Sequence, residues 1–360
     1  MKKSLIALAV AGAFAAPAQA VEVNGAMAVG LDFSKASSST AGGASVSTHG
    51  LNSGYSLINL SHSEDIGDGM KMDVFLQAEW KPDNGTSNLS ISNRDSYIGL
   101  SGSFGAIRLG TNENAYERML YSHNYMDGDW SYGNIGIMGG TGGNGISTVW
   151  NRTADTIMYY SPNMNGLSFE VDYVTPSTAK TGGAGAVNPN IISAAVEFAP
   201  AEGNFRVYGA LHNSSDVVGA KSDESNMLIG GGMTMGNIKW DVIFENMKSN
   251  SGAPGAADIK HSAIDLEAQI GLPTGNLGLS FVKAQKTSGR PVTDDNTGAM
   301  SISGNYMHNL GKSSWLFLIV SNIKNEDNAN YSLAAFTGTL AGGNNGRDYT
   351  NFVVGLKHAF

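Results

Sequence analysis

Apolar and polar residues alternate along much of this chain, most clearly over Gly69–Lys81. Successive side chains of an extended strand point to opposite faces, so this stretch would present one apolar face and one largely charged face. It is also about as long as a tilted strand needs to cross a bilayer, ~9–11 residues. A two-layer sheet in water could use the same alternation. We favour a wall between lipid and water, which predicts a transmembrane strand here.

The same period of two recurs to the C-terminus and predicts about sixteen strands, in the range of outer-membrane barrels. The clearest further examples are Leu167–Val174, Phe205–His212, Ile238–Asn246 and Ile264–Ile270. Short turns such as Asp65–Gly69 alternate with longer polar connections such as Ser34–Gly54. We therefore predict an all-β fold, a transmembrane antiparallel up-and-down β-barrel with short turns at one end and long loops at the other.

The connection Thr111–Arg152 is exceptional, because loops as long as its roughly forty residues usually carry function or are disordered. It is too aromatic for a free tail, since it contains Tyr116, Tyr121, Tyr125, Trp130 and Tyr132. A barrel of this size encloses water. We therefore predict that this third external loop folds into the lumen and narrows it.

The first twenty residues have a basic start, an apolar middle and a small-residue ending at Ala18–Ala20. This pattern predicts a secretory signal peptide over residues 1–20, cleaved to leave a single barrel domain at 21–360. Its apolar run is too short for a membrane-anchoring helix.

Composition narrows the function classes further. Without Lys2 and Lys3, 20 basic residues face 31 acidic ones, which argues against a nucleic-acid partner. The chain has no cysteine, so a closed ladder of backbone hydrogen bonds is predicted to hold the fold. The histidines have no metal-ligand spacing, and no nucleophile elbow occurs. We predict no enzyme activity, no cofactor and no metal.

Four blocks, in the right order and spanning the mature chain, resemble those of Gram-negative general porins. They are Ser63–Lys71 (SEDIGDGMK), Asn93–Gly105 (NRDSYIGLSGSFG), Arg152 with Tyr160–Pro162 and Asn165–Leu167, and the closing Val354–Phe360 (VGLKHAF). The resemblance implies a sixteen-stranded homotrimeric channel in the outer membrane of a Gram-negative bacterium. It also implies an inward third loop that bears acids and faces arginines of the wall.

The resemblance makes Arg94 one of the wall arginines, with Arg108 and Arg152 as possible members. Two further family positions are not basic here, because they fall near Leu57 and at Thr111. The loop acids predicted to face the arginines are Glu113, Glu117, Asp127 and Asp129. A transverse field between such groups would tune the choice of ions. Because acids outnumber bases in the predicted lumen, we expect mild cation selectivity.

The sequence thus predicts a passive diffusion channel for ions and small hydrophilic solutes, embedded in outer-membrane lipid. A channel specific for one solute class, with the loop aromatics forming a binding track, is the main alternative. An outer-membrane enzyme or an adhesin is a more distant one.

Overall fold

The computed structural model describes residues 21–37, 44–54, 56–83, 94–126, 136–140, 147–150, 152–176, 189–217, 221–289, 295–332 and 345–360. Nearly all elements in these residues are strands, and the one named helix is α2 (Ala115–Ser122). The strands are β1 (Glu22–Ala36), β2 (Val46–Ser53), β3 (Ser56–Gly67), β4 (Met70–Trp80), β5 (Ser96–Gly102), β6 (Gly105–Asn112), β7 (Thr153–Tyr160), β8 (Leu167–Val174), β9 (Asn190–Phe198), β10 (Phe205–Ser215), β11 (Asp223–Met235), β12 (Ile238–Asn250), β13 (Ile259–Leu272), β14 (Gly275–Ala284), β15 (Ala299–Asn309), β16 (Ser314–Asn325) and β17 (Tyr349–Ala359).

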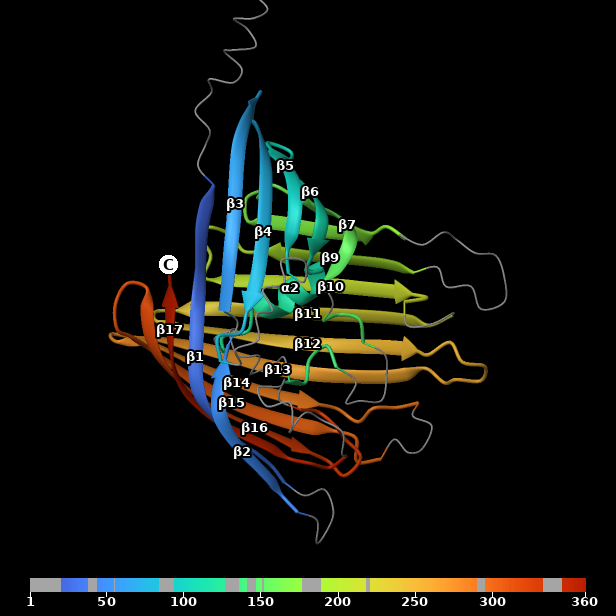
Figure 1. The fold of residues 1–360 in the computed structure, drawn as a ribbon. Helices are drawn as coiled ribbons and strands as arrows, with labels where there is room; N and C mark the ends of the chain where they lie inside the picture. Colours follow the sequence, from blue (N-terminus) through green and yellow to red (C-terminus); the bar gives the residue numbers. More distant parts are fainter. Residues whose placement is uncertain are drawn as a thin grey trace, which may run out of the picture.

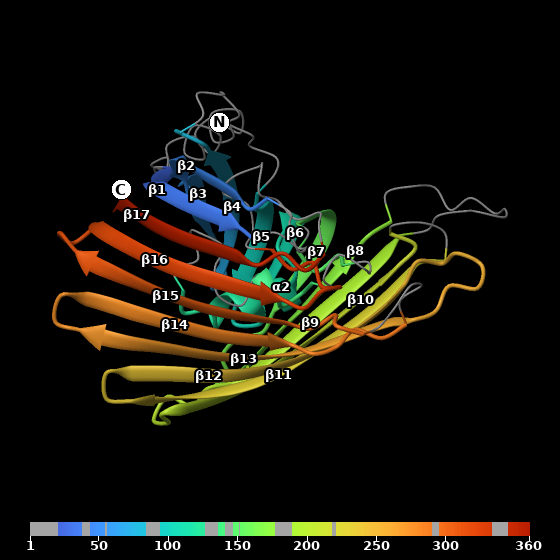
Figure 2. The same ribbon diagram turned by 90° about the horizontal axis from the view of Figure 1, so that it is seen from below.

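The strands form one antiparallel sheet that closes on itself, because β1 pairs with β17 from Ala26–Ala359 to Ala36–Tyr349. Figure 2 shows β17 lying beside β1. β2 and β3 both pair with β1, so they are two parts of one strand separated by residues 54 and 55. Ser56 stabilises this break by accepting a hydrogen bond from the Ala28 N–H. The fold is therefore a closed barrel of sixteen strands, as predicted.

One predicted connection was wrong in extent. Ser34–Gly54 was expected to be a loop, but β1 continues to Ala36 and β2 begins at Val46. The eight residues of β2 all pair with β1. A tight turn is present within the predicted range Asp65–Gly69, but it is shorter than predicted, because β3 runs to Gly67 and only Asp68 and Gly69 join it to β4. Both have positive φ, 53° and 72°, as two-residue hairpin turns require.

The outer face of the barrel is apolar. In neighbouring strands Ile229, Phe244 and Ile264 lie opposite one another, and each is at least 36% exposed. Their sequence neighbours Leu228, Glu245 and Ala263 point the other way and are buried. Exposed apolar side chains cover the outside of most other strands in the same way. Soluble proteins do not expose a continuous apolar band of this kind, and a lipid environment accounts for it.

The inner face carries polar and charged side chains, and α2 lies within the curve of the strands in both Figure 1 and Figure 2. Ala115, Tyr116, Met119 and Leu120 of α2 are buried. Among the described residues, no helix has the length and apolar character needed to cross a membrane. Residues 1–20, the expected signal peptide, lie outside the described residues.

Candidate functional site

The connection from β6 to β7 is described at 113–126, 136–140, 147–150 and 152, and these parts lie against inward-facing side chains. In α2, the N–H of Ala115 donates to Asp172 of β8 and that of Tyr116 donates to Ser193 of β9 at 3.0 Å. Asn114 caps the helix by accepting the Glu117 N–H at 2.9 Å. The helix is therefore fixed at its first turn both by its own cap and by the wall.

Glu245 of β12 joins two separate parts of the connection. Its carboxylate accepts the Tyr116 hydroxyl at 2.8 Å and the Gly139 N–H at 2.9 and 3.0 Å. All three residues are buried. Glu224 of β11 acts similarly, accepting the N–H and hydroxyl of Thr148 at 2.8 and 2.7 Å. The wall acids thus hold the connection by its donors.

Further along, Tyr125 donates its hydroxyl to Asp241 at 2.5 Å and its N–H to Glu267 at 3.1 Å. Gly278 of β14 lies beneath it, and a Cβ there would come within 2.3 Å of the Tyr125 carbonyl oxygen. Glycine is therefore required for this close approach. The alternation along the sequence predicted that Asp241, Glu245 and Glu267 face inward, but only the fold shows that they bond the connection.

Arg94 and Arg152 both take part in ion pairs. Arg94 is 6% exposed, and its Nε lies 3.5 Å from Glu79 Oε2 on β4. Arg152 Nε donates to Asp95 at 3.1 Å, and its Nη2 contacts Glu113. Asp95 also accepts the Glu113 N–H at 3.2 Å. Because Glu113 begins the connection and Arg152 ends it, this cluster joins its two ends.

Arg108 of β6 lies between two aromatic rings. Its guanidinium carbon is 4.3 Å from the centre of the Tyr97 ring and 4.4 Å from that of Tyr160, within the range of cation–π contacts. Its Nη1 also donates to the Tyr160 hydroxyl at 3.2 Å.

Sequence reasoning missed Arg118, which α2 places beside this cluster. Its Nε lies 3.1 Å from Glu170 and its Nη2 lies 3.7 Å from Asp172. No motif marks Arg118, and the only signal for it was the inward alternation of the two acids on β8.

Glu117 lies in the first turn of α2 and is 2% exposed. Burial and, to a smaller extent, the nearby Asp95 carboxylate raise the pKa of its carboxyl from 4.5 to about 8, against the opposing effect of Arg118 and Arg94. Near neutral pH this carboxyl is therefore largely protonated. Of the seven predicted site residues, Asp127 and Asp129 lie outside the described residues. No cluster of three or more metal-ligating side chains occurs in the described ranges.

A family model described as Gram-negative porin matches residues 4–328. The chain belongs to the Gram-negative porins. This porin is 28% identical over 362 residues to outer membrane porin protein 32 of Delftia acidovorans, covering all of both chains. It is also similar to the solved structure of an anion-selective porin from Comamonas acidovorans, with 25% identity, a TM-score of 0.77, and coverage of 95% of this chain and 100% of that one.

The trimer form of OmpT from Vibrio cholerae has a TM-score of 0.67 at 12% identity, which shows the fold alone, and 95% and 99% of the two chains are covered. With the closed barrel and its apolar outer face, family membership makes this protein a diffusion channel of the outer membrane rather than an enzyme.

Proposed function

We propose that this porin prefers cations to anions and that the connection 111–152 forms its constriction. The main support is the pairing of the arginines beside the connection. Arg94, Arg118, Arg152 and Arg206 each have a carboxylate within 4 Å. Arg108 is enclosed by tyrosines instead. Among the described residues, most of the arginine charge beside the connection is therefore compensated, in a chain with an excess of acids.

Leu57 supports the same proposal. It lies directly opposite Glu79 in the pairing of β3 with β4, beside the acid that Arg94 neutralises. An arginine at this position, as the resemblance to general porins implies for the family, would add a positive charge here. Although one similar structure is described as anion-selective, the leucine removes part of the basis for an anion preference in this chain.

Reversal-potential measurements in a KCl gradient across a planar bilayer test this proposal. We expect the potential to report a cation preference, and Leu57→Arg to shift it toward anions. Leu57→Gln is the matched control, because it changes polarity without adding charge. A clear anion preference of the unmodified porin would refute the proposal.

Three finer features complete the proposed function. The residues 1–20 are a signal peptide, so protein purified from outer membranes should have the mass of a chain that begins at Val21. The porin is a homotrimer, a proposal supported by the family resemblance and by the OmpT trimer form. Crosslinking in native membranes should then give a ladder that ends at three subunits, and one ending at a single subunit would contradict it. Small hydrophilic solutes cross the lumen without an energy source.

A further inference from the structure

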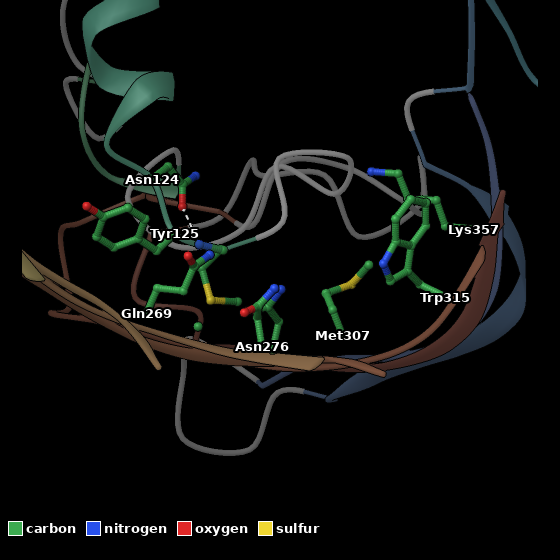
Figure 3. Close-up of a pocket in the computed structure, with 10 residues that line it drawn as sticks. Asn124, Tyr125, Gln269, Asn276, Met307, Trp315 and Lys357 are labelled. Atoms are coloured by element: carbon green, nitrogen blue, oxygen red, sulfur yellow. Dashed lines mark hydrogen bonds between the residues drawn. The ribbon is translucent and has the colours of Figure 1, made fainter. Parts of the chain in front are cut away.

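A side cavity of about 300 Å³ opens between the connection and the wall of β13–β17. Figure 3 shows Tyr125 and Asn124 of the connection above it, Gln269 and Asn276 of the wall below, and Trp315 with Lys357 at the opposite side. Asn276 and Trp315 each follow a short turn of the barrel closely. The cavity therefore lies toward the short-turn end of the lumen.

The lining of the side cavity is unusually rich in amides for a wall that otherwise carries many acids. Asn124, Gln269, Asn276 and Asn305 all contribute. An amide side chain both donates and accepts hydrogen bonds, as a hydroxyl group does. The Oδ1 of Asn305 has no hydrogen-bond partner among the described residues, although the side chain is only 4% exposed. A buried acceptor of this kind is costly unless a partner reaches it.

Trp315 gives the cavity a flat apolar surface. It points inward from β16, as its neighbours Phe317 and Ile319 do, and Met126 and Met307 add further apolar lining. The Lys357 ammonium lies 5.9 Å from the centre of the Trp315 ring and supplies a further donor. The lining thus combines one aromatic face with several groups that match hydroxyls, and none of the described residues that line it is a carboxylate.

We propose that the side cavity is a binding site for a polyhydroxylated ring, a mono- or disaccharide, that crosses this porin. Such a solute has an apolar ring face for Trp315 and hydroxyls at its edge for the amides. The volume is at the small end of ligand pockets, which suits one or two sugar rings. The inference rests on the proposed passage of small hydrophilic solutes and adds to it a solute class and a place.

Current-noise analysis of single channels with maltose as the probe tests the site. We expect maltose to produce open-channel noise that saturates in the millimolar range. Trp315→Ala should raise the half-saturating concentration about tenfold, as truncation of an aromatic anchor does at other binding surfaces. Trp315→Phe should retain most of the affinity, and Asn276→Ala should lose several-fold. Gln77→Ala is the matched control, an amide of β4 that bonds Asn59 and does not line the cavity.

The outcomes separate this inference from the proposed function. Noise that rises linearly with maltose and never saturates would overturn the site, whatever the ion preference. A half-saturating maltose concentration that is unchanged in both Trp315→Ala and Asn276→Ala would also overturn it. If Trp315→Ala does not insert into the bilayer, an unchanged half-saturating concentration in Asn276→Ala would overturn the site, with Trp315→Phe as the reference that keeps an aromatic ring. Reversal potentials recorded without sugar report on cation preference alone, so either conclusion can fail while the other stands.

Discussion

Replacing Glu245 with alanine should loosen the connection between β6 and β7. Glu245 is the acceptor for the Tyr116 hydroxyl and the Gly139 N–H, and all three groups are buried. A buried donor left unsatisfied costs about 1–3 kcal/mol, so two would cost about 2–6 kcal/mol. Even the lower value would raise the equilibrium constant for displacing the connection roughly thirtyfold relative to the unmodified porin, because about 1.4 kcal/mol is a factor of ten.

Single-channel recording at increasing voltage measures this effect. We expect Glu245→Ala to close at lower voltage and to show more open-channel noise than the unmodified porin. Tyr116→Phe, which removes one of the two bonds, should show a smaller change in the same direction. Asp73→Ala is the matched control, because this inward acid of β4 bonds Ser101 of the neighbouring strand instead of the connection. If Glu245→Ala and Asp73→Ala behaved alike, the carboxylate could not be holding the connection as argued.

Three other predictions concern the same region. Arg152→Gln should lower the free energy of unfolding by about 1.5–3 kcal/mol, the contribution of hydrogen bonds to charged groups. It should also raise the cation preference, because Asp95 and Glu113 lose the arginine that they share. An unchanged Tm and an unchanged reversal potential would count against this. Folding raises the pKa of Glu117 from 4.5 to about 8. Between these two pH values the folded protein keeps a proton that the unfolded chain releases, so the stability of the fold decreases as the pH rises. Above about pH 8 the Glu117 carboxylate is negatively charged in the folded protein as well. Cation preference should therefore increase through about pH 8, and Glu117→Gln should flatten the profile. Gly278→Ala should displace Tyr125 and alter the conductance, because the new Cβ would lie 2.3 Å from the Tyr125 carbonyl oxygen. Gly304→Ala is the control, since the nearest atom to its new Cβ would lie 3.5 Å away. Equal conductances of the two variants would contradict this prediction.

The barrel could be predicted because its strands separate lipid from water, so apolar and polar residues alternate along them. The prediction was wrong over Ser34–Gly54, where this alternation is weak. β2 has the sequence VSTHGLNS, with little alternation, yet every residue pairs with β1. Where a strand has no apolar face, backbone hydrogen bonds to a neighbour can still extend it, and these leave no trace in the side-chain pattern.

The site was less predictable because its contacts join residues far apart in the chain. Alternation placed Glu245 on the inward face, but Tyr116 lies 129 residues before it. Arg118 has two acid partners on β8 and no motif of its own. The resemblance directed attention to Arg94 as a wall arginine, which stays a prediction, and the structure adds that Arg94 forms an ion pair with Glu79. The sequence could therefore indicate which face of a strand a side chain occupies, whereas its partner on another strand or on the connection became known only from the fold.

These pairings imply that holding the connection and choosing ions are coupled at the inward acids of β8–β12. On β8–β12 the acids Asp172, Glu224 and Glu245 face inward and accept hydrogen bonds from the connection. Neutralising them therefore changes selectivity and mobility together. On β3 and β4, Leu57 lies opposite Glu79, which forms an ion pair with Arg94 rather than with a residue of the described connection. Selectivity should be adjustable there without loosening the connection, so Leu57→Arg should shift the reversal potential while the closing voltage stays unchanged.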